Sequence, residues 1–183
     1  QKRLDPDLYP NVNWRDVILK DHAWNTQAHM SLSGGGENAR YYVSLGLLNN
    51  EALFKQDKAS PYSANVDYHK YNFRANIDAN VTRTTTLSLN METVFVTQNS
   101  PGFGDNNNAL WQAQANLPPT LVPVRYSNGQ LPAYGVNGNE ISPYVQLNYT
   151  GYRAVERYST KTNLMLRQDL SMLVKGCLLY TSP

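Results

Sequence analysis

The side chains best suited to hold a ligand are aromatic rings in the segment 98–157, which has few charges. Aromatic faces stack on the apolar faces of sugars and peptides, and neighbouring amides supply hydrogen bonds. We therefore predict a ligand-facing surface in this segment, with one alternative: the same rings pack the segment onto itself. The six candidate ligand-binding residues are Trp111, Tyr126, Tyr134, Tyr144, Tyr149 and Tyr152.

The ionisable residues do not form a recognisable catalytic set, because no nucleophile, base and orienting group recur together. His22, His29 and His69 are too scattered for a metal site. The single cysteine, Cys177, has no companion at metal-ligand spacing. We predict no catalytic residue, no bound metal and no cofactor, so the chain is not expected to be an enzyme.

The composition excludes two further classes of protein. The 183-residue chain has a net charge of only +2 and no cluster of lysine and arginine, which argues against a nucleic-acid partner. It also lacks the roughly 18 consecutive apolar residues that a transmembrane helix needs. Charged residues make up 16% of the chain, below the roughly 25% of ordinary soluble domains.

Strict alternation of apolar and polar residues marks five long strands. In the third strand, apolar residues occupy the odd positions from 71 to 81 and polar residues the even positions. These runs of about 9 to 14 residues exceed the usual soluble strand and match the length that crosses a bilayer. The strands are predicted near 23–33, 40–48, 70–81, 84–97 and 158–170.

The two faces of these strands are predicted to meet different surroundings. One face carries no charge and suits lipid, whereas the other is hydrophilic enough to line a water-filled lumen. Carboxylates on the polar side, Asp169 included, are expected to pair with its basic residues. The predicted lipid-facing residues are Met30, Val43, Leu45, Ile77, Leu87, Leu89 and Leu164. The predicted lumen-facing residues are Arg74, Asn76, Asp78, Asn90, Glu92, Lys161 and Arg167.

Connections between the strands alternate in length, short after the first and third strands and long after the second and fourth. Short periplasmic turns and long extracellular loops are typical of outer-membrane barrels. The longest connection is expected to hold a short helix near 108–116, ended by Pro118 and Pro119, and a small hairpin around 127–129. The predicted fold is all-β: an antiparallel meander of long strands, part of a transmembrane β-barrel, with long extracellular loops and a short N-terminal helix.

A soluble antiparallel sandwich also alternates, so a secreted or surface carbohydrate-binding or adhesive β-domain is the alternative. Residues 1–22 are predicted to form an irregular lead-in with one short helix capped by Asn13. Residues 23–176 then form a partial barrel with the long extracellular loop 98–157. The alternation breaks in 177–183, which we interpret as a non-native tail. We expect the chain to be a fragment of a longer protein.

Four stretches resemble the SusC/RagA family of TonB-dependent outer-membrane receptors. They occur in the family's order and at family-like spacing, and together they run through most of residues 5–176. They read DPDLYPNVNWRDVILK at 5–20, SGGGENARYYVSLGLLN at 33–49, YNFRANIDANVT at 71–82 and LNYTGYR at 147–153. The tail 177–183 departs from the family's pattern, which agrees with a non-native origin.

The resemblance implies a barrel of about 22 strands, plugged by an N-terminal domain, in the bacterial outer membrane. It further implies energised uptake of glycans or oligopeptides. In the family, the TonB complex supplies the energy through a TonB box, and a SusD-like lipoprotein covers the extracellular mouth. The expected partners of the full-length protein are therefore the TonB complex, a SusD-like lipoprotein, the ligand and outer-membrane lipid.

Overall fold

The computed structural model describes residues 5–64, 66–102 and 108–171. Contacts between residues divide the chain into two compact units, which are described separately. The loop unit comprises Gln1–Thr26, Leu48–His69 and Val96–Glu156, and the sheet unit comprises Gln27–Leu47, Lys70–Phe95 and Arg157–Pro183. The predicted tail 177–183 lies outside the described residues.

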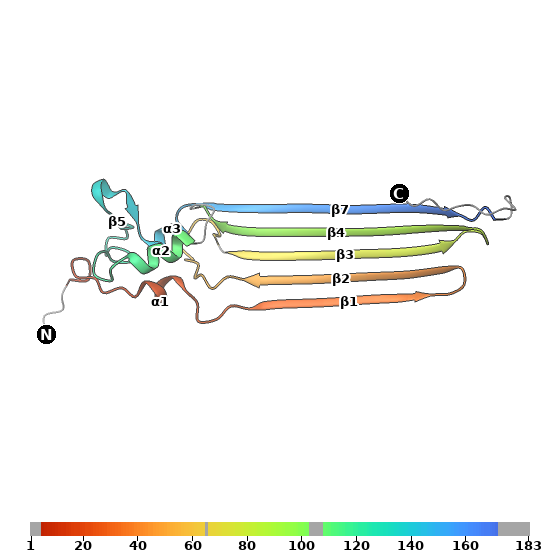
Figure 1. Ribbon diagram of the computed structural model, residues 1–183. Helices are drawn as coiled ribbons and strands as arrows, with labels where there is room; N and C mark the ends of the chain where they lie inside the picture. Colours follow the sequence, from red (N-terminus) through yellow and green to blue (C-terminus); the bar gives the residue numbers. More distant parts are fainter. Residues whose placement is uncertain (1–4, 65, 103–107, 172–183) are drawn as a thin grey trace. The chain divides into compact units, whose positions relative to one another are not determined.

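Five long strands form one sheet in the order β1-β2-β3-β4-β7. Neighbouring strands run in opposite directions (Figure 1), so the sheet is an antiparallel meander, as the sequence predicted. Period-two alternation suits this arrangement because successive side chains of a strand point to opposite faces. The strands are β1 (Asn25–Gly35), β2 (Ala39–Glu51), β3 (Asp67–Asn80), β4 (Thr85–Pro101) and β7 (Tyr152–Gln168).

The two short turns of the sheet unit are joined to each other by Asn80. Its backbone N–H donates to the carbonyl of Asn38 at 2.8 Å, and its side-chain amide donates to the carbonyl of Glu37 at 2.8 Å. Nearby, the N–H of Asp169 donates to the carbonyl of Thr84 at 2.7 Å. Both turns and the end of β7 therefore lie at one end of the sheet.

Side-chain contacts agree on one register between β3 and β4. Arg74 forms an ion pair with Glu92 at 2.9 Å. Three residues earlier in β3 and three later in β4, the rings of Tyr71 and Phe95 stack with their centroids 6.1 Å apart. Opposite offsets of equal size are what an antiparallel pair requires. The charged pair and the aromatic pair therefore lie on opposite faces of the sheet.

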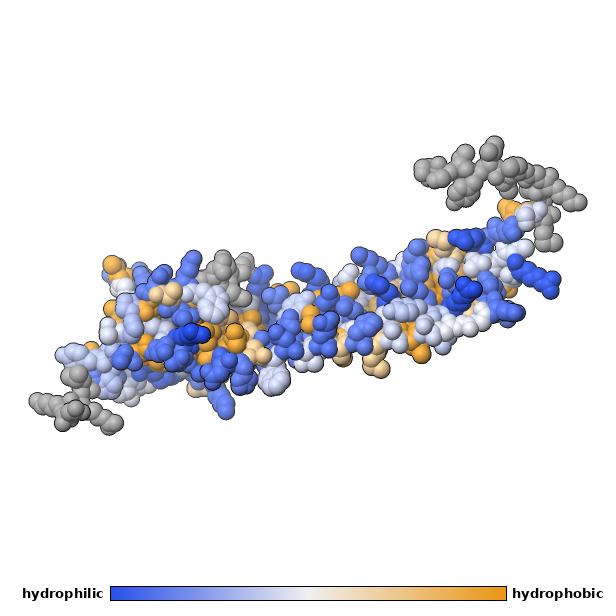
Figure 2. Space-filling model, turned by 60° about the horizontal axis from the view of Figure 1, so that its bottom comes forward, coloured by the Kyte–Doolittle hydropathy of each residue, from blue (hydrophilic) through white to orange (hydrophobic). Residues whose placement is uncertain are grey.

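The apolar face of the sheet unit is exposed. Met30 is 75% exposed and Leu164 is 67% exposed, and Leu45 and Ile77 are exposed as well. Figure 2 shows hydrophobic groups reaching the molecular surface between polar ones. An uncharged, exposed face of this kind marks a contact with lipid or another protein. Among the described residues, no helix has the length and apolar character needed to cross a membrane.

The loop unit contains short helices and a small hairpin around two hydrophobic clusters. One cluster is built on Val12, Trp14, Leu117 and Val122, and the other on Ile18, Phe54, Leu110 and Leu147. The elements are α1 (Trp14–Ile18), α2 (Asn108–Asn116), β5 (Ala133–Tyr134), the 3-10 helix η1 (Val136–Gly138), β6 (Glu140–Ile141) and α3 (Pro143–Asn148).

Strands β4 and β7 extend further than the alternation indicated. Strand β4 continues to Pro101 and β7 begins at Tyr152, which shortens the connection predicted at 98–157 to 102–151. Alternation identifies strand segments whose two faces differ in polarity. Backbone pairing does not need this difference and continues through uniformly polar stretches such as 98–100. At the end of the ladder, the N–H of Gly102 donates to the carbonyl of Gly151 at 3.0 Å.

Local predictions in the loop unit had mixed outcomes. Helix α2 has the predicted bounds, Asn108–Asn116. Asn13 precedes α1, but its side chain makes no capping bond, and its amide donates to the Asp16 carboxylate at 2.7 Å. A turn lies near 127–129, where the N–H of Gly129 donates to the carbonyl of Tyr126. The strand pair of this region is β5–β6, so placing the hairpin at 127–129 was wrong.

Candidate functional site

Helix α3 holds the centre of the loop unit. Pro143 begins the helix, and the hydroxyl of Ser142 accepts a capping bond from the N–H of Val145 at 3.4 Å. Proline suits the first helical position because its missing N–H would be unpaired there. The helix buries Leu147 in a hydrophobic cluster and carries Tyr144 at its edge. One short helix thereby brings residues of distant segments together.

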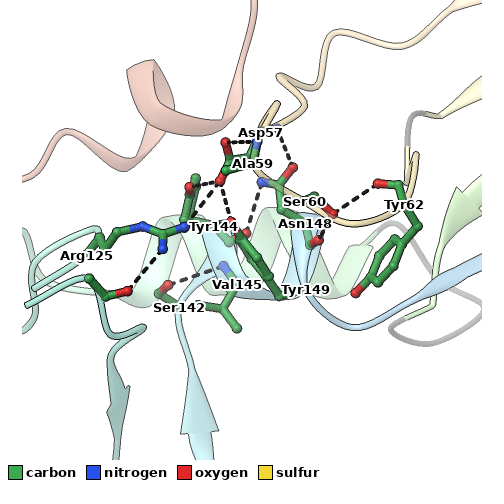
Figure 3. Close-up of polar contacts among 11 residues, drawn as sticks. Asp57, Ala59, Ser60, Tyr62, Arg125, Ser142, Tyr144, Val145, Asn148 and Tyr149 are labelled. Carbon is green, nitrogen blue, oxygen red and sulfur yellow. Dashed lines mark hydrogen bonds and ion pairs between the residues drawn. The ribbon is translucent and has the colours of Figure 1, made fainter.

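The Asp57 cluster, defined as Asp57, Arg125, Tyr144, Asn148 and Tyr149, is a group of hydrogen-bonded polar side chains in the loop unit (Figure 3). The hydroxyls of Tyr144 and Tyr149 both donate to Oδ2 of Asp57. The guanidinium of Arg125 lies 3.4 Å from the same oxygen and donates to the Tyr149 hydroxyl at 2.6 Å. Three separate segments of the chain therefore meet at one carboxylate.

Hydrogen bonding fixes the charge state of this cluster. The tyrosine hydroxyls, and then the N–H of Ala59, lower the pKa of Asp57 to about 2. Burial, followed by the bond to Asp57, raises the pKa of Tyr144 to about 12. The carboxylate is therefore ionised and Tyr144 is neutral at physiological pH. A carboxylate with donors on every side is an anchor rather than a proton-transfer group, because it has no tendency to accept a proton.

Asn148 is the buried member of the Asp57 cluster. Its side chain is only 1% exposed, yet each polar group of that side chain has a partner. Its Oδ1 accepts from the N–H of Asp57 at 2.7 Å, and its Nδ2 donates to the carbonyl of Tyr144 at 3.1 Å. The hydroxyl of Ser60 donates to the Asn148 carbonyl at 2.8 Å. A satisfied buried network favours one conformation, so the segment after Phe54 is fixed to α3.

The lead-in is attached to the connection 102–151 through the carboxylate of Asp7. Asp7 accepts hydrogen bonds from the N–H of Ser127 at 3.1 Å and from its hydroxyl at 2.5 Å. Further along the lead-in, the N–H of Val12 donates to the carbonyl of Pro119 at 2.9 Å. The part of the lead-in around Asp7 and Val12 is therefore bonded to the connection at Ser127 and Pro119.

The six candidate ligand-binding rings are not gathered into one surface. The ring centroids of Tyr144 and Tyr149 lie 5.9 Å apart, but both hydroxyls donate hydrogen bonds to Asp57. The other four have separate neighbours. Trp111 packs on Phe54 at 5.6 Å, Tyr152 lies 6.0 Å from Tyr62, Tyr134 borders a cavity beside Glu140, and Tyr126 begins the turn at 127–129.

The seven predicted lumen-facing residues line two polar recesses in the sheet unit. A recess of about 360 Å³ contains Arg74, Asn76, Asn90, Glu92 and Lys161. A second recess, of about 380 Å³, contains Asp78 and Arg167 together with Arg40.

The expected ion pairing on the polar face is found in one of three cases. Glu92 pairs with Arg74. The Asp169 carboxylate accepts from the N–H of Ser171 at 2.9 Å instead. Among the described residues, no ion pair joins Asp78 to Arg167.

Sequence reasoning missed Asp57, Arg125 and Asn148. Asp57 and Arg125 belong to no motif or alternating run, and Asn148 lies in the stretch LNYTGYR, which indicates a family resemblance but not the role of this side chain. The two tyrosines that bind Asp57 were selected, but for stacking rather than for their hydroxyls. Among the described residues, no group of three or more His, Cys, Asp or Glu side chains is placed to hold a metal ion.

Comparisons with known proteins bear on the interpretation of the sheet. No family model matches the chain. TonB-dependent receptor P26 of Formosa agariphila is 36% identical over 74 residues, which are 40% of this chain and 6% of that protein. A solved structure of the RagAB peptide importer in the closed-closed state matches 88% of this chain and 18% of that chain, with a TM-score of 0.55 and 17% sequence identity. The chain is therefore similar in sequence to a TonB-dependent receptor over part of its length, and its fold is similar to part of the RagAB importer.

The chain spans 6% of the length of the curated receptor and 18% of the chain in the solved structure. The fold likeness also agrees with the meander of long strands, whose exposed apolar face lacks a covering layer among the described residues.

Proposed function

We propose that this chain is part of a TonB-dependent outer-membrane transporter that imports glycans or oligopeptides together with a SusD-like lipoprotein. The observation that carries the proposal is the exposed apolar face of the sheet unit, which carries no charge between the bounds of that unit. Such a face suits hydrocarbon, and the similarity to a TonB-dependent receptor agrees with it.

The sheet order leaves β1 and β7 at its edges. Unpaired backbone groups are costly in lipid, so each edge strand pairs with further strands of a closed barrel of about 22 strands. In this proposal residues 23–176 belong to the barrel and the connection 102–151 is extracellular. The predicted lipid-facing and lumen-facing residues keep those assignments. Energy from the TonB complex drives uptake.

In this proposal the ligand meets the extracellular connection. Trp111 and Tyr152 are exposed and accessible to a ligand, and Tyr126 and Tyr134 are partly so. Tyr144 and Tyr149 belong to the Asp57 cluster and act by holding the connection in place. Their contribution to binding is therefore indirect.

Uptake by cells tests the proposal. Deleting the gene of the complete receptor from its own bacterium should abolish accumulation of a fluorescently labelled oligopeptide or glycan pool, and the intact gene should restore it. Removing the TonB protein should have the same effect, because the transport is energised. Unchanged accumulation of both pools in the deletion strain would contradict the transport function.

The soluble alternative makes the opposite prediction for the isolated segment. Residues 23–176 produced alone should aggregate unless detergent is present, because the exposed apolar face is bare in water. Analytical ultracentrifugation with and without detergent measures this. A detergent-free monomer that unfolds cooperatively would favour the secreted β-domain.

A further inference from the structure

A cavity of about 620 Å³ lies in the loop unit beside α2 and the β5–β6 hairpin. Its walls include the apolar residues Leu117, Pro118 and Ile141, and the ring of Tyr134 also contributes. The cavity is separate from the Asp57 cluster, whose five members are absent from its lining. Its volume is that of a site for a small ligand group.

The charge in this cavity has one sign. Glu140 is its single charged lining residue, and it has no ion-pair partner among the described residues. The Glu140 side chain lies against the backbone of Gly135, where an added Cβ would come within 2.9 Å of it. The Glu140 charge, after burial, also contributes to raising the pKa of Tyr134. The negative charge of Glu140 is therefore close enough to the cavity wall to affect the Tyr134 hydroxyl.

Gln146 supplies a second acceptor. The residue is only 8% exposed, and its Nε2 donates to the carbonyl of Ile141 at 3.1 Å. That bond fixes the amide, and its Oε1 is buried without a hydrogen-bond partner among the described residues. A buried acceptor without a partner is costly, so a ligand donor that reaches it is favoured.

We propose that this cavity binds the lysine side chain of an imported peptide, with the aliphatic stem on Leu117 and Ile141 and the ammonium group at Glu140 and Gln146. The inference rests on the proposed transport function and narrows its ligand to a lysine-containing oligopeptide. An ammonium group has three donors and no acceptor, which matches a carboxylate and an unpartnered amide oxygen. Its four-carbon stem matches the apolar walls.

The test uses the complete receptor purified in detergent and two probes of nearly equal shape. Nα-acetyl-lysine methylamide carries the ammonium group, and Nα-acetyl-norleucine methylamide lacks it. Binding is measured by saturation-transfer NMR titration in wild type, E140Q and the control D21N, which removes an exposed carboxylate outside the cavity. We expect the lysine probe to bind wild type and D21N equally and E140Q about tenfold more weakly.

A second variant protects the test against a folding artefact. In E140K the reversed charge should abolish binding of the lysine probe while leaving that of the norleucine probe unchanged, which shows that the cavity is intact. Equal binding of the two probes to wild type, or equal binding of the lysine probe to wild type and E140Q, would overturn the inference. So would binding of maltotriose that displaces the lysine probe.

Uptake separates the two proposals. If labelled peptides enter cells through the receptor but lysine-containing and lysine-free peptides compete equally, the cavity assignment fails and transport stands. If the lysine probe binds as expected but no labelled pool depends on the receptor for entry, transport fails and the cavity assignment stands as a binding site.

Discussion

Asp57 joins parts of the chain that are far apart in sequence, because its acceptors are shared among Tyr144, Tyr149 and Arg125. Its own N–H is taken by Asn148. Removing this one carboxylate would leave two tyrosine hydroxyls and a guanidinium without their common partner. The loop unit therefore depends on Asp57 more than its partly exposed position indicates.

We expect D57N to destabilise the loop unit by about 2 kcal/mol at neutral pH, because the folded pKa of Asp57 is lowered to about 2 from 3.8. A lowered carboxyl pKa stabilises the folded state above the unfolded pKa. The stabilisation should therefore be complete above pH 4 and be lost as the pH falls toward 2. Hydrogen exchange of segments 55–62 and 142–150 measures it.

The matched control for Asp57 is D16N. Asp16 is exposed, and its side chain accepts a bond from Asn13 alone among the described residues. Exchange in D16N should equal that of wild type in both segments. Faster exchange in D16N than in D57N, or no pH dependence in wild type, would contradict the role given to the Asp57 cluster.

The aromatic residues show where prediction from sequence reached its limit at this scale. Their concentration between 98 and 157 is visible in the sequence, but a tyrosine that stacks on a ligand and one that donates to a carboxylate have the same local pattern. The partner of Tyr144 lies 87 residues away. A contact of that kind depends on the packing of α3, which no periodicity encodes.

At the scale of elements, β3 offers neighbouring residues on opposite faces. Ile77 is exposed on the apolar face, and Asn76 lines the polar recess with Arg74. In the complete receptor, I77R should cost about 2–4 kcal/mol if the site lies near the bilayer midplane, whereas N76R should be mild. Urea titration of the receptor refolded into lipid bilayers measures both. Equal costs would show that the faces are assigned wrongly.

Strand β7 begins after a glycine with positive φ. Gly151 has φ +92°, and nothing lies within 4 Å of an added Cβ, so the cost of G151A comes from the backbone alone. We expect G151A to lower the free energy of unfolding by about 1 kcal/mol. G36A is the matched control, because Gly36 has equally open surroundings without positive φ. Similar costs for the two variants in the same urea titration would contradict this account.

The elements themselves were largely predictable, and their ends were not. Alternation located the long strands because each carries apolar residues on one face and polar residues on the other. It failed at Pro101 and Tyr152, where pairing continues without alternation. The capping role expected of Asn13 was wrong as well: its Nδ2 donates to the Asp16 carboxylate, and its side chain accepts no capping bond.

At the scale of the molecule, the connection 102–151 can be shortened by deletion, because its two ends, Gly102 and Gly151, are adjacent. Gly102 already donates to Gly151, so replacing 103–150 by a short glycine-rich turn closes the β4–β7 pair without stretching it. The shortened receptor should still reach the outer membrane in heat-resistant form, because the strands of the sheet unit are unchanged. Ligand and lipoprotein binding should weaken.

The same deletion should loosen segments that it does not remove. Ile18 and Phe54 lose Leu110 and Leu147, with which they form a hydrophobic cluster. Trypsin should therefore cleave at Lys20 or Lys55 in the shortened receptor faster than in wild type. Uptake and cleavage at wild-type rates would show that the connection neither binds the ligand nor supports the lead-in.

Asn80 has a consequence for the order in which the sheet assembles. Strands β1 and β2, like β3 and β4, are joined by a few residues, so each hairpin forms on the microsecond scale with little loss of chain entropy. The bonds from Asn80 to Glu37 and Asn38 require both turns to exist already. Asn80 therefore contributes to the docking of two finished hairpins. Its Oδ1 also accepts a bond from the Thr86 hydroxyl within the β3–β4 hairpin, so N80A should slow refolding at both the formation of that hairpin and the docking step.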